Sequence, residues 1–220
     1  MLFGAMEPLP NKTFRNLPKD KQDRITEAAV LEFGEKGYSG ASINMLVERL
    51  GIAKGSIFQY FGDKNGLFLF IFNKTTESVK NRLRTIRDDT DDVEVFSRLE
   101  KTLREGINFL QDHPLIYRLY LGVLFDSKIP FRDSILFSLR QYSYGYLRTL
   151  LSEAKAKGEL RNNLDIDKTC FILDAVMDRF IQTHTVRHLD SDLGIYNADG
   201  KTIDSWITAI IDIIKNGIGA

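Results

Sequence analysis

The chain has 220 residues, with 30 Lys and Arg against 30 Asp and Glu, and 43% of its residues are hydrophobic. These values are typical of a globular protein of one large or two small domains. Cys170 is the single cysteine, which excludes an internal disulfide and fits a reducing compartment. The start of the chain lacks the pattern of a signal peptide, and the longest apolar run, residues 67–72, is too short to span a bilayer. We therefore expect a cytoplasmic protein without a membrane partner.

The first half of the sequence predicts four helices after a flexible tail over residues 1–18. Residues 19–36 carry apolar side chains at helical spacing, and Gly37 supplies a stop. Ser42 is a favourable N-cap for a second helix that ends at Gly51. A short third helix covers roughly residues 54–61, and Asp63 caps a long fourth helix.

The second half predicts five more helices. They cover about residues 93–111, 115–125 and 131–157, then a helix capped by Asp165, and a last helix over residues 202–216. Isoleucines occupy too many faces of this last helix for a lone surface helix, so either its own domain or a second chain must cover it. No strand alternation is found, and the predicted fold class is all-α.

The charge is distributed unevenly between the two halves. Residues 1–87 hold 14 Lys and Arg against 9 Asp and Glu, a net charge of +5, whereas residues 88–220 hold 16 against 21, a net charge of −5. The asymmetry is small, but it favours a nucleic-acid partner for the first half.

The segment GIAKGSIFQYFGDK, residues 51–64, points to DNA. In a helix, Ile57 and Phe61 share an inward face while Gln59 points the opposite way. Two short helices around a Gly-bounded turn form a helix-turn-helix candidate, whose second helix enters the major groove. There an amide can pair with adenine and a ring can lie against a thymine methyl group. The residues expected to contact DNA are Ser42, Lys54, Gly55, Ser56, Phe58, Gln59, Tyr60 and Lys64.

This region resembles the DNA-binding signature of the tetracycline-repressor (TetR) family of transcriptional regulators. The similarity covers about residues 19–79 and rests on positions that agree in register: Phe33, Gly37, Tyr38, Ser42, Gly51, Gly55, Ser56, Ile57, Phe58, Tyr60, Phe61 and Lys64. The chain departs from the pattern at Phe58, where the family often has Tyr, and at Gly66, where it often has Glu.

The resemblance implies an all-helical homodimer joined through the last two helices of each protomer. Residues 19–65 would bind a DNA operator as a helix-turn-helix domain, and residues 66–220 would bind a small-molecule effector and form the dimer. Effector binding would lower the affinity for the operator, so that the protein acts as a repressor. The alternative is a helical enzyme or small-molecule carrier that its first domain tethers to DNA.

Nine aromatic residues crowd residues 109–146 and have two readings. Aromatic side chains at helical spacing are more often ordinary core than pocket lining. If some of them line an effector pocket, the expected residues are Phe109, Tyr117, Tyr142 and Tyr146, and the effector is apolar or planar.

Three further residues carry reactive or metal-binding side chains. His184 and His188 have the i, i+4 spacing of a metal pair but lack a clear third ligand, so a cation near a helix C-terminus is the better reading. Cys170 lies on an apolar stripe and reads as a core thiol. No nucleophile motif is present, and no enzyme activity, metal or cofactor is expected.

Overall fold

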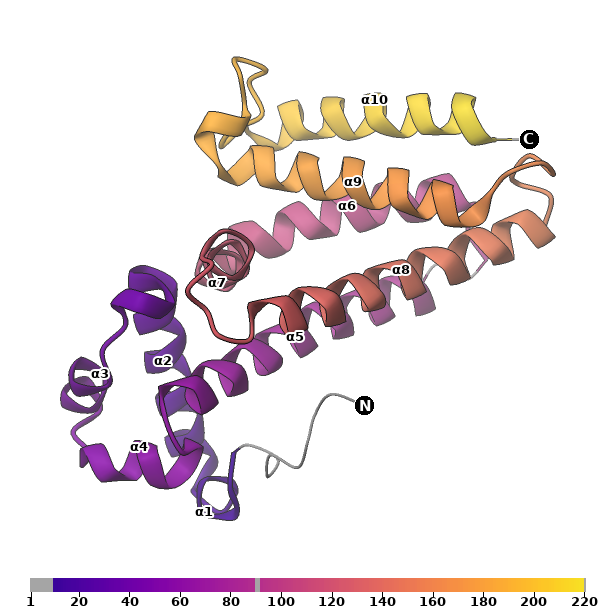
Figure 1. Cartoon of the computed structure of the whole chain (residues 1–220). Helices are drawn as coiled ribbons and strands as arrows, with labels where there is room; N and C mark the ends of the chain where they lie inside the picture. The colour runs from indigo at the N-terminus through magenta and orange to yellow at the C-terminus, as the bar shows by residue number, and fades with distance from the viewer. Residues whose placement is uncertain (1–9, 90–91, 220) are drawn as a thin grey trace. The chain divides into compact units, whose positions relative to one another are not determined.

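The computed structural model describes residues 10–89 and 92–219, and the regular elements in this part of the chain are helices (Figure 1). The predicted all-α class is confirmed. The only β pairing among the described residues is an isolated antiparallel bridge between Leu160 and Gly219. The helices are α1 (Lys12–Arg15), α2 (Lys19–Gly40), α3 (Ile43–Leu50), α4 (Lys54–Phe61), α5 (Lys64–Asp88), α6 (Val95–Asp112), α7 (Pro114–Phe125), α8 (Arg132–Ala156), α9 (Ile166–Thr185), the 3-10 helix η1 (Arg187–Leu189) and α10 (Gly200–Ile218).

The helix caps that the sequence predicts are present. The Ser42 hydroxyl accepts a hydrogen bond from the backbone N–H of Met45 at 3.4 Å, and Asp63 Oδ1 accepts one from the N–H of Gly66 at 2.8 Å. Each bond satisfies a backbone donor that the first turn of a helix leaves without an internal partner. The Asp63 cap lets α5 begin at Lys64 even though glycine stands at position 66.

Of two predicted boundaries in the first half, the stop at Gly37 is present and the extent of the tail was wrong. Gly37 interrupts α2 with a non-helical backbone, φ 68° and ψ 174°, and a short helical stretch follows to Gly40. Residues 10–18, expected as part of a flexible tail, contain α1, because Phe14 packs into a cluster of rings and is only 2% exposed. Residues 1–9, the rest of that expected tail, lie outside the described residues.

The chain forms two compact units. The first comprises the described part of residues 1–81 together with residues 113–132, and the second comprises the described parts of residues 82–112 and 133–220. The first unit therefore extends beyond residue 65, where the sequence suggested a domain boundary. The reason is packing: the first turns of α5 bury Leu67, Phe68 and Ile71, and α7 lies against α2.

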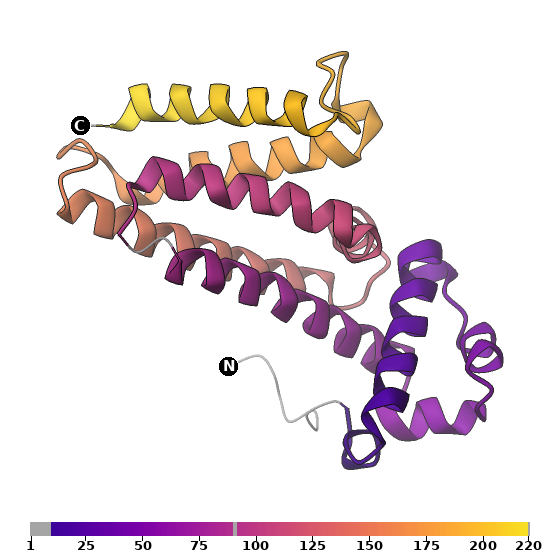
Figure 2. The same ribbon diagram turned by 180° about the vertical axis from the view of Figure 1, so that it is seen from behind.

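One face of the last helix, α10, is covered by the other helices of the second unit. Along α10, Ile203, Ile207 and Ile211 are buried in a core shared with α6, α8 and α9, so the helix's own domain covers this face. Figures 1 and 2 show α6, α9 and α10 side by side in this unit. Another face stays open, because Ile213 is 71% exposed.

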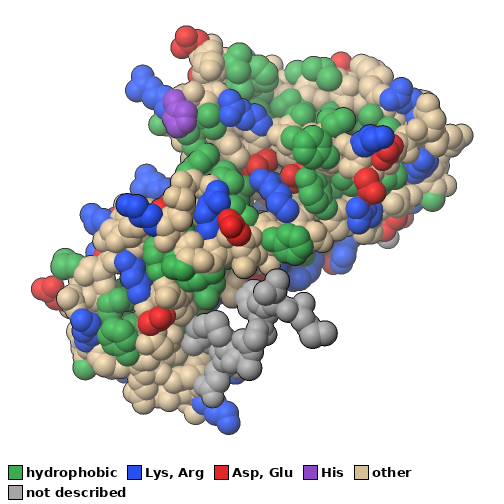
Figure 3. All heavy atoms as spheres, in the orientation of Figure 1, with side chains coloured by type: hydrophobic (Ala, Val, Ile, Leu, Met, Phe, Trp, Pro, Cys, Tyr) green, Lys and Arg blue, Asp and Glu red, His purple; other side chains and the backbone are tan. Residues whose placement is uncertain are grey.

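Exposed apolar side chains recur along α9 and α10. Phe171 is 62% exposed, Ile172 and Val176 of the same helix are also exposed, and Ile213 lies on α10. These four residues are called the α9–α10 apolar surface below. Figure 3 shows hydrophobic side chains at the surface over these two helices. Among the described residues, no helix combines the length and apolar content needed to cross a membrane.

Candidate nucleic-acid interface

The helices α3 and α4 form the predicted helix-turn-helix. Gly51 ends α3 in the left-handed conformation, with φ 65° and ψ 34°, which glycine adopts without steric penalty. The N–H groups of Gly51 and Ile52 then bond to the carbonyls of Glu48 and Val47, each at 3.2 Å. This tight reversal lets α4 begin at Lys54, only three residues after Gly51.

The two faces of α4 differ as the helical spacing predicts. Ile57 and Phe61 are buried in the core of the first unit, whereas Gln59 is exposed and Phe58 is 42% exposed. An exposed phenyl ring beside an exposed amide is what a helix reading base edges needs, since the ring can meet a thymine methyl group and the amide an adenine.

The start of α4 is open to an anion. Ala53 occupies the N-cap position and supplies no side-chain hydrogen bond to the first turn. Lys54 and Gly55 are exposed, and a Cβ atom added at Gly55 would meet no atom within 4 Å. Glycine at this position is therefore not required by packing inside the chain. Free N–H groups, a positive helix end and a neighbouring lysine together favour a phosphate.

The other predicted DNA-contacting residues differ in accessibility. Ser42 and Ser56 are half-buried, and the Ser42 hydroxyl keeps its donor while it caps α3. Lys64 is also half-buried: its Nζ lies 3.4 Å from the Ser39 carbonyl and 5.1 Å from the centre of the Tyr38 ring. Burial lowers the pKa of the Lys64 amine from its ordinary value.

Tyr60 is the predicted DNA-contacting residue whose surroundings differ most from the expectation. Its side chain is buried, and its ring lies edge-on to Phe14 at 5.7 Å between ring centres. The ring is therefore part of the core that supports α4 and not part of the exposed face with Phe58 and Gln59. A contact between Tyr60 and DNA stays a prediction, and it would involve only the small exposed part of this residue.

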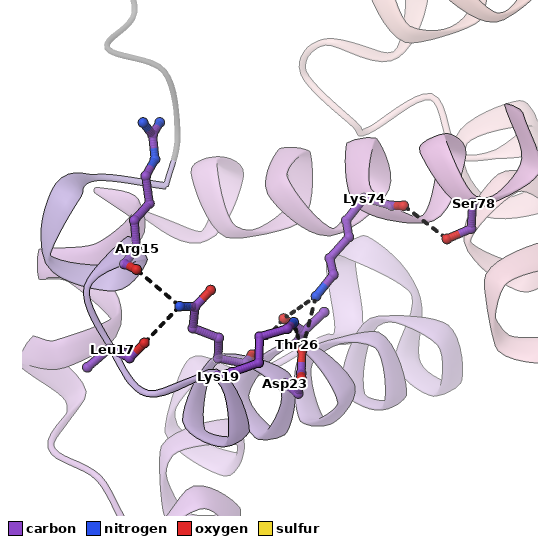
Figure 4. A network of polar contacts seen from close by, with 8 residues as sticks. Arg15, Leu17, Lys19, Asp23, Thr26, Lys74 and Ser78 are labelled. Carbon is purple, nitrogen blue, oxygen red and sulfur yellow. Dashed lines mark hydrogen bonds and ion pairs between the residues drawn. The ribbon is translucent and has the colours of Figure 1, made fainter. Parts of the chain in front are cut away.

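A polar network ties α2 to α5 next to this interface (Figure 4). Asp23 of α2 forms ion pairs with Lys19 at 2.6 Å and with Lys74 of α5 at 3.6 Å. Lys74 also donates to the Thr26 hydroxyl at 3.3 Å. The two lysines lower the pKa of the Asp23 carboxyl, chiefly through the hydrogen bond from Lys19. The network joins the helix that supports α4 to the helix that follows it.

Asn11 was not predicted to belong to this interface, yet it lies against the last turn of α4. Its backbone N–H donates to the Tyr60 carbonyl at 3.1 Å, and its side-chain amide donates to the Gln59 carbonyl. An Asn before a short helix was the available signal, but its partners lie 48 and 49 positions further along the chain, beyond the reach of local patterns.

The aromatic residues expected at an effector pocket fall in different units. Tyr117 is buried in the first unit, 5.6 Å from Tyr120 between ring centres. Phe109, Tyr142 and Tyr146 are half-buried in the second unit. The Tyr146 hydroxyl lies 3.3 Å from the Thr102 hydroxyl. The structure therefore groups three of the four candidates by unit and leaves their contact with an effector a prediction.

The histidines and the cysteine take structural positions. His184 is buried, with Nδ1 3.0 Å from the Ile195 carbonyl, while His188 is exposed on η1, beyond the end of α9. The two residues thus do not share one helical face, and the described residues hold no group of three potential metal ligands. Cys170 is buried, which raises the pKa of its thiol and agrees with its reading as a core residue.

Comparisons with known proteins agree with the geometry. Residues 25–71, which include α3 and α4, match the model of the N-terminal domain of "Bacterial regulatory proteins, tetR family". The chain is 25% identical to the HTH-type transcriptional repressor NicS of Pseudomonas putida, over 90% of this chain and 92% of that protein.

Solved structures share the fold. The crystal structure of a TetR family transcriptional regulator from Chloroflexus aurantiacus is 28% identical and superposes with a TM-score of 0.69, covering 96% of this chain and 99% of that one. FadR from Bacillus subtilis, solved in complex with stearoyl-CoA, superposes with a TM-score of 0.68 at 18% identity, over 87% of this chain and 96% of that one. The match over residues 25–71 identifies a DNA-binding domain of the TetR family in this chain, and the similarity to TetR-family regulators extends over most of its length.

Proposed function

We propose that the protein is a repressor that binds a palindromic or near-palindromic operator as a homodimer and leaves it when a small molecule binds the second unit. The observation that carries the proposal is the outward pair Phe58 and Gln59 on a helix whose opposite face is buried. A helix of this kind reads one half-site, and a twofold dimer reads two. NicS is itself named a transcriptional repressor, which supports repression as the direction of control.

The α9–α10 apolar surface supports the dimer. Exposed apolar side chains on α9 and α10 leave apolar surface in contact with water in a monomer. A second copy of the same surface would cover them. The last two helices are also the pair from which the family resemblance implies a four-helix interface.

A buried arginine supports an effector that carries negative charge. Arg98 of α6 is 3% exposed, and its Nε has no hydrogen-bond acceptor among the described residues. Its ion pair with Glu153 spans 3.6 Å, and that carboxylate is half in solvent. A guanidinium stays charged and has five N–H donors. Burying one of these donors without a hydrogen-bond acceptor is unfavourable. A carboxylate or phosphate group on the effector would satisfy it.

The surroundings of Arg98 supply polar and apolar neighbours for such a molecule. Thr102, one turn along α6, donates to the Arg98 carbonyl at 2.8 Å and lies beside the Tyr146 hydroxyl. The core next to these residues is otherwise aliphatic and aromatic. We therefore propose an amphiphilic organic anion, with its charged group at Arg98. Stearoyl-CoA, the ligand in the FadR structure, belongs to that chemical class, although at 18% identity the likeness to FadR shows only the fold.

Selection from random duplex DNA followed by release tests this function. We expect the purified protein to select inverted half-sites. Dodecanoate should then release the selected DNA, while dodecanamide, its uncharged counterpart, should not. Arg98→Met keeps the length of the side chain without its charge and should abolish the response to dodecanoate.

Each result of this experiment is informative. Asymmetric single sites would contradict the dimeric repressor, and release by the amide as readily as by the acid would contradict the anion-binding role of Arg98. Chemical conversion of dodecanoate by the protein would instead support the alternative of an enzyme tethered to DNA.

Lys64→Ala is expected to weaken binding to all DNA sequences and to flatten its salt dependence. Only part of the Lys64 amine is engaged by the Ser39 carbonyl, so donors remain for a phosphate. Losing one phosphate contact reduces the slope of log affinity against log salt by about 1. Lys36→Ala, at an exposed lysine of α2, is the control and should leave the slope unchanged. An unchanged slope in a folded Lys64→Ala protein would place this side chain away from DNA.

A further inference from the structure

The C-terminal end of α4 is closed by hydrogen bonds from two directions. The last four carbonyls of a helix have no partner within it. Here the Phe58 carbonyl accepts from the N–H of Gly62 at 2.8 Å, and the Phe61 carbonyl accepts from the N–H of Asp63 at 3.0 Å. These two donors follow α4 directly along the chain, and they leave the carbonyls of Gln59 and Tyr60 to be satisfied from elsewhere.

Asn11 satisfies both remaining carbonyls. Its backbone N–H donates to the Tyr60 carbonyl at 3.1 Å and its side-chain Nδ2 donates to the Gln59 carbonyl. The third polar group of the residue is also used, because Asn11 Oδ1 accepts from the N–H of Phe14 at 3.1 Å and so caps α1. A single asparagine therefore starts α1 and closes the last turn of the reading helix.

Aromatic packing holds Asn11 in this place. Phe14 lies 4.9 Å from Phe61 and 5.2 Å from Phe70 of α5 between ring centres, in addition to its contact with Tyr60. On the far side of α1, Gln22 donates to the carbonyls of Arg15 at 3.1 Å and Leu17 at 2.8 Å. Figure 4 shows these last bonds joining the end of α1 to the start of α2. α1 is thus fixed at both ends.

We infer that Asn11 is a positioning residue for DNA reading and acts through the backbone of Gln59. The inference rests on the proposal that α4 reads DNA. Asn11 bonds to the backbone carbonyl of Gln59, the residue whose side-chain amide would meet a base edge. The orientation of that amide therefore depends on the hydrogen bond between Asn11 Nδ2 and the Gln59 carbonyl. An isolated helix of eight residues is marginal in water, so its last turn depends on contacts from outside. Losing this bond lets the last turn of α4 fray and spreads the orientations of the Gln59 amide.

Asn11→Ser is the variant that removes only the hydrogen bond to the Gln59 carbonyl. Serine is neutral, can still cap α1, and keeps the backbone N–H that bonds Tyr60, but its hydroxyl is too short to reach the Gln59 carbonyl. We expect affinity for the selected operator to fall roughly 3- to 10-fold, the range for one lost hydrogen bond, with unchanged binding to random duplex and an unchanged salt slope. Asn16→Ser makes the same substitution at an exposed position at the end of α1 and should have no effect.

A double-mutant cycle with Gln59→Ala separates positioning from general support of the fold. If Asn11 acts through Gln59, Asn11→Ser should change the preference for operator variants in the wild-type background and have no further effect once Gln59 is alanine. Equal losses in both backgrounds, or an equal loss on operator and random duplex, would overturn the inference. So would an Asn11→Ser protein that ranks operator variants as the wild type does. A wild type without any preference among variants would instead contradict sequence reading by α4 itself.

Discussion

Replacing Phe171 with glutamate is expected to convert the dimer to a monomer and to lower operator affinity by about 10²- to 10⁴-fold. Phe171 is 62% exposed on α9, so a charge there costs little in an isolated chain but must be desolvated in an interface. Without the dimer, binding the second half-site becomes an independent bimolecular event. Light scattering should report a mass falling from twice the 25.2 kDa of the chain to that of one chain.

The control for this prediction is Leu193→Glu. Leu193 is 52% exposed but lies in the connector between η1 and α10 and not on α9 or α10. It should keep both the dimer mass and the operator affinity. A Phe171→Glu protein that remains dimeric with full affinity would show that the two copies meet through another surface.

Gln59→Ala is expected to lower discrimination among operator variants by about 1–3 kcal/mol at one base pair in each half-site. Gln59 is exposed, so removing its amide should leave the core intact, and alanine is a strong helix former. Binding to random duplex should hardly change, because phosphate contacts carry it and Lys54, Lys64 and the start of α4 remain. The measurement is the ranking of an operator-variant library at fixed salt.

Gln141→Ala, at an exposed glutamine on α8, is the matched control and should reproduce the wild-type ranking. If the Gln59→Ala ranking is also that of the wild type, Gln59 does not read a base. Specificity would then rest on Ser56, on Phe58 or on the sequence-dependent shape of the DNA.

Local signals in the sequence predicted α3, α4 and the turn between them well. The turn at Gly51, the cap at Ser42 and the inward pair Ile57 and Phe61 each depend on residues within four positions of one another, and all were found as predicted. Contact of the exposed residues with DNA stays a prediction, which the variants of Lys64 and Gln59 test.

Long-range contacts account for most of what the sequence could not predict. Phe14 was expected within a flexible tail, but the fold brings Phe61 and Phe70 beside it. The extent of the first unit was missed because α7 returns to pack against α2, some 80 positions earlier in the chain. His188 was expected on the helix of His184, but α9 ends at Thr185.

Fold stability and the proposed DNA binding favour different residues at position 55. The open space around Gly55 means that the fold itself would accept a larger side chain, and replacing a helical glycine with alanine commonly stabilises a protein by a few tenths to about 1 kcal/mol. Under the proposed role of α4 in DNA binding, the same side chain would stand between the start of the helix and a DNA phosphate. Directed evolution for thermal stability alone would therefore tend to discard this glycine, and evolution under selection for repression would restore it, so thermostable variants substituted here deserve a functional screen before use.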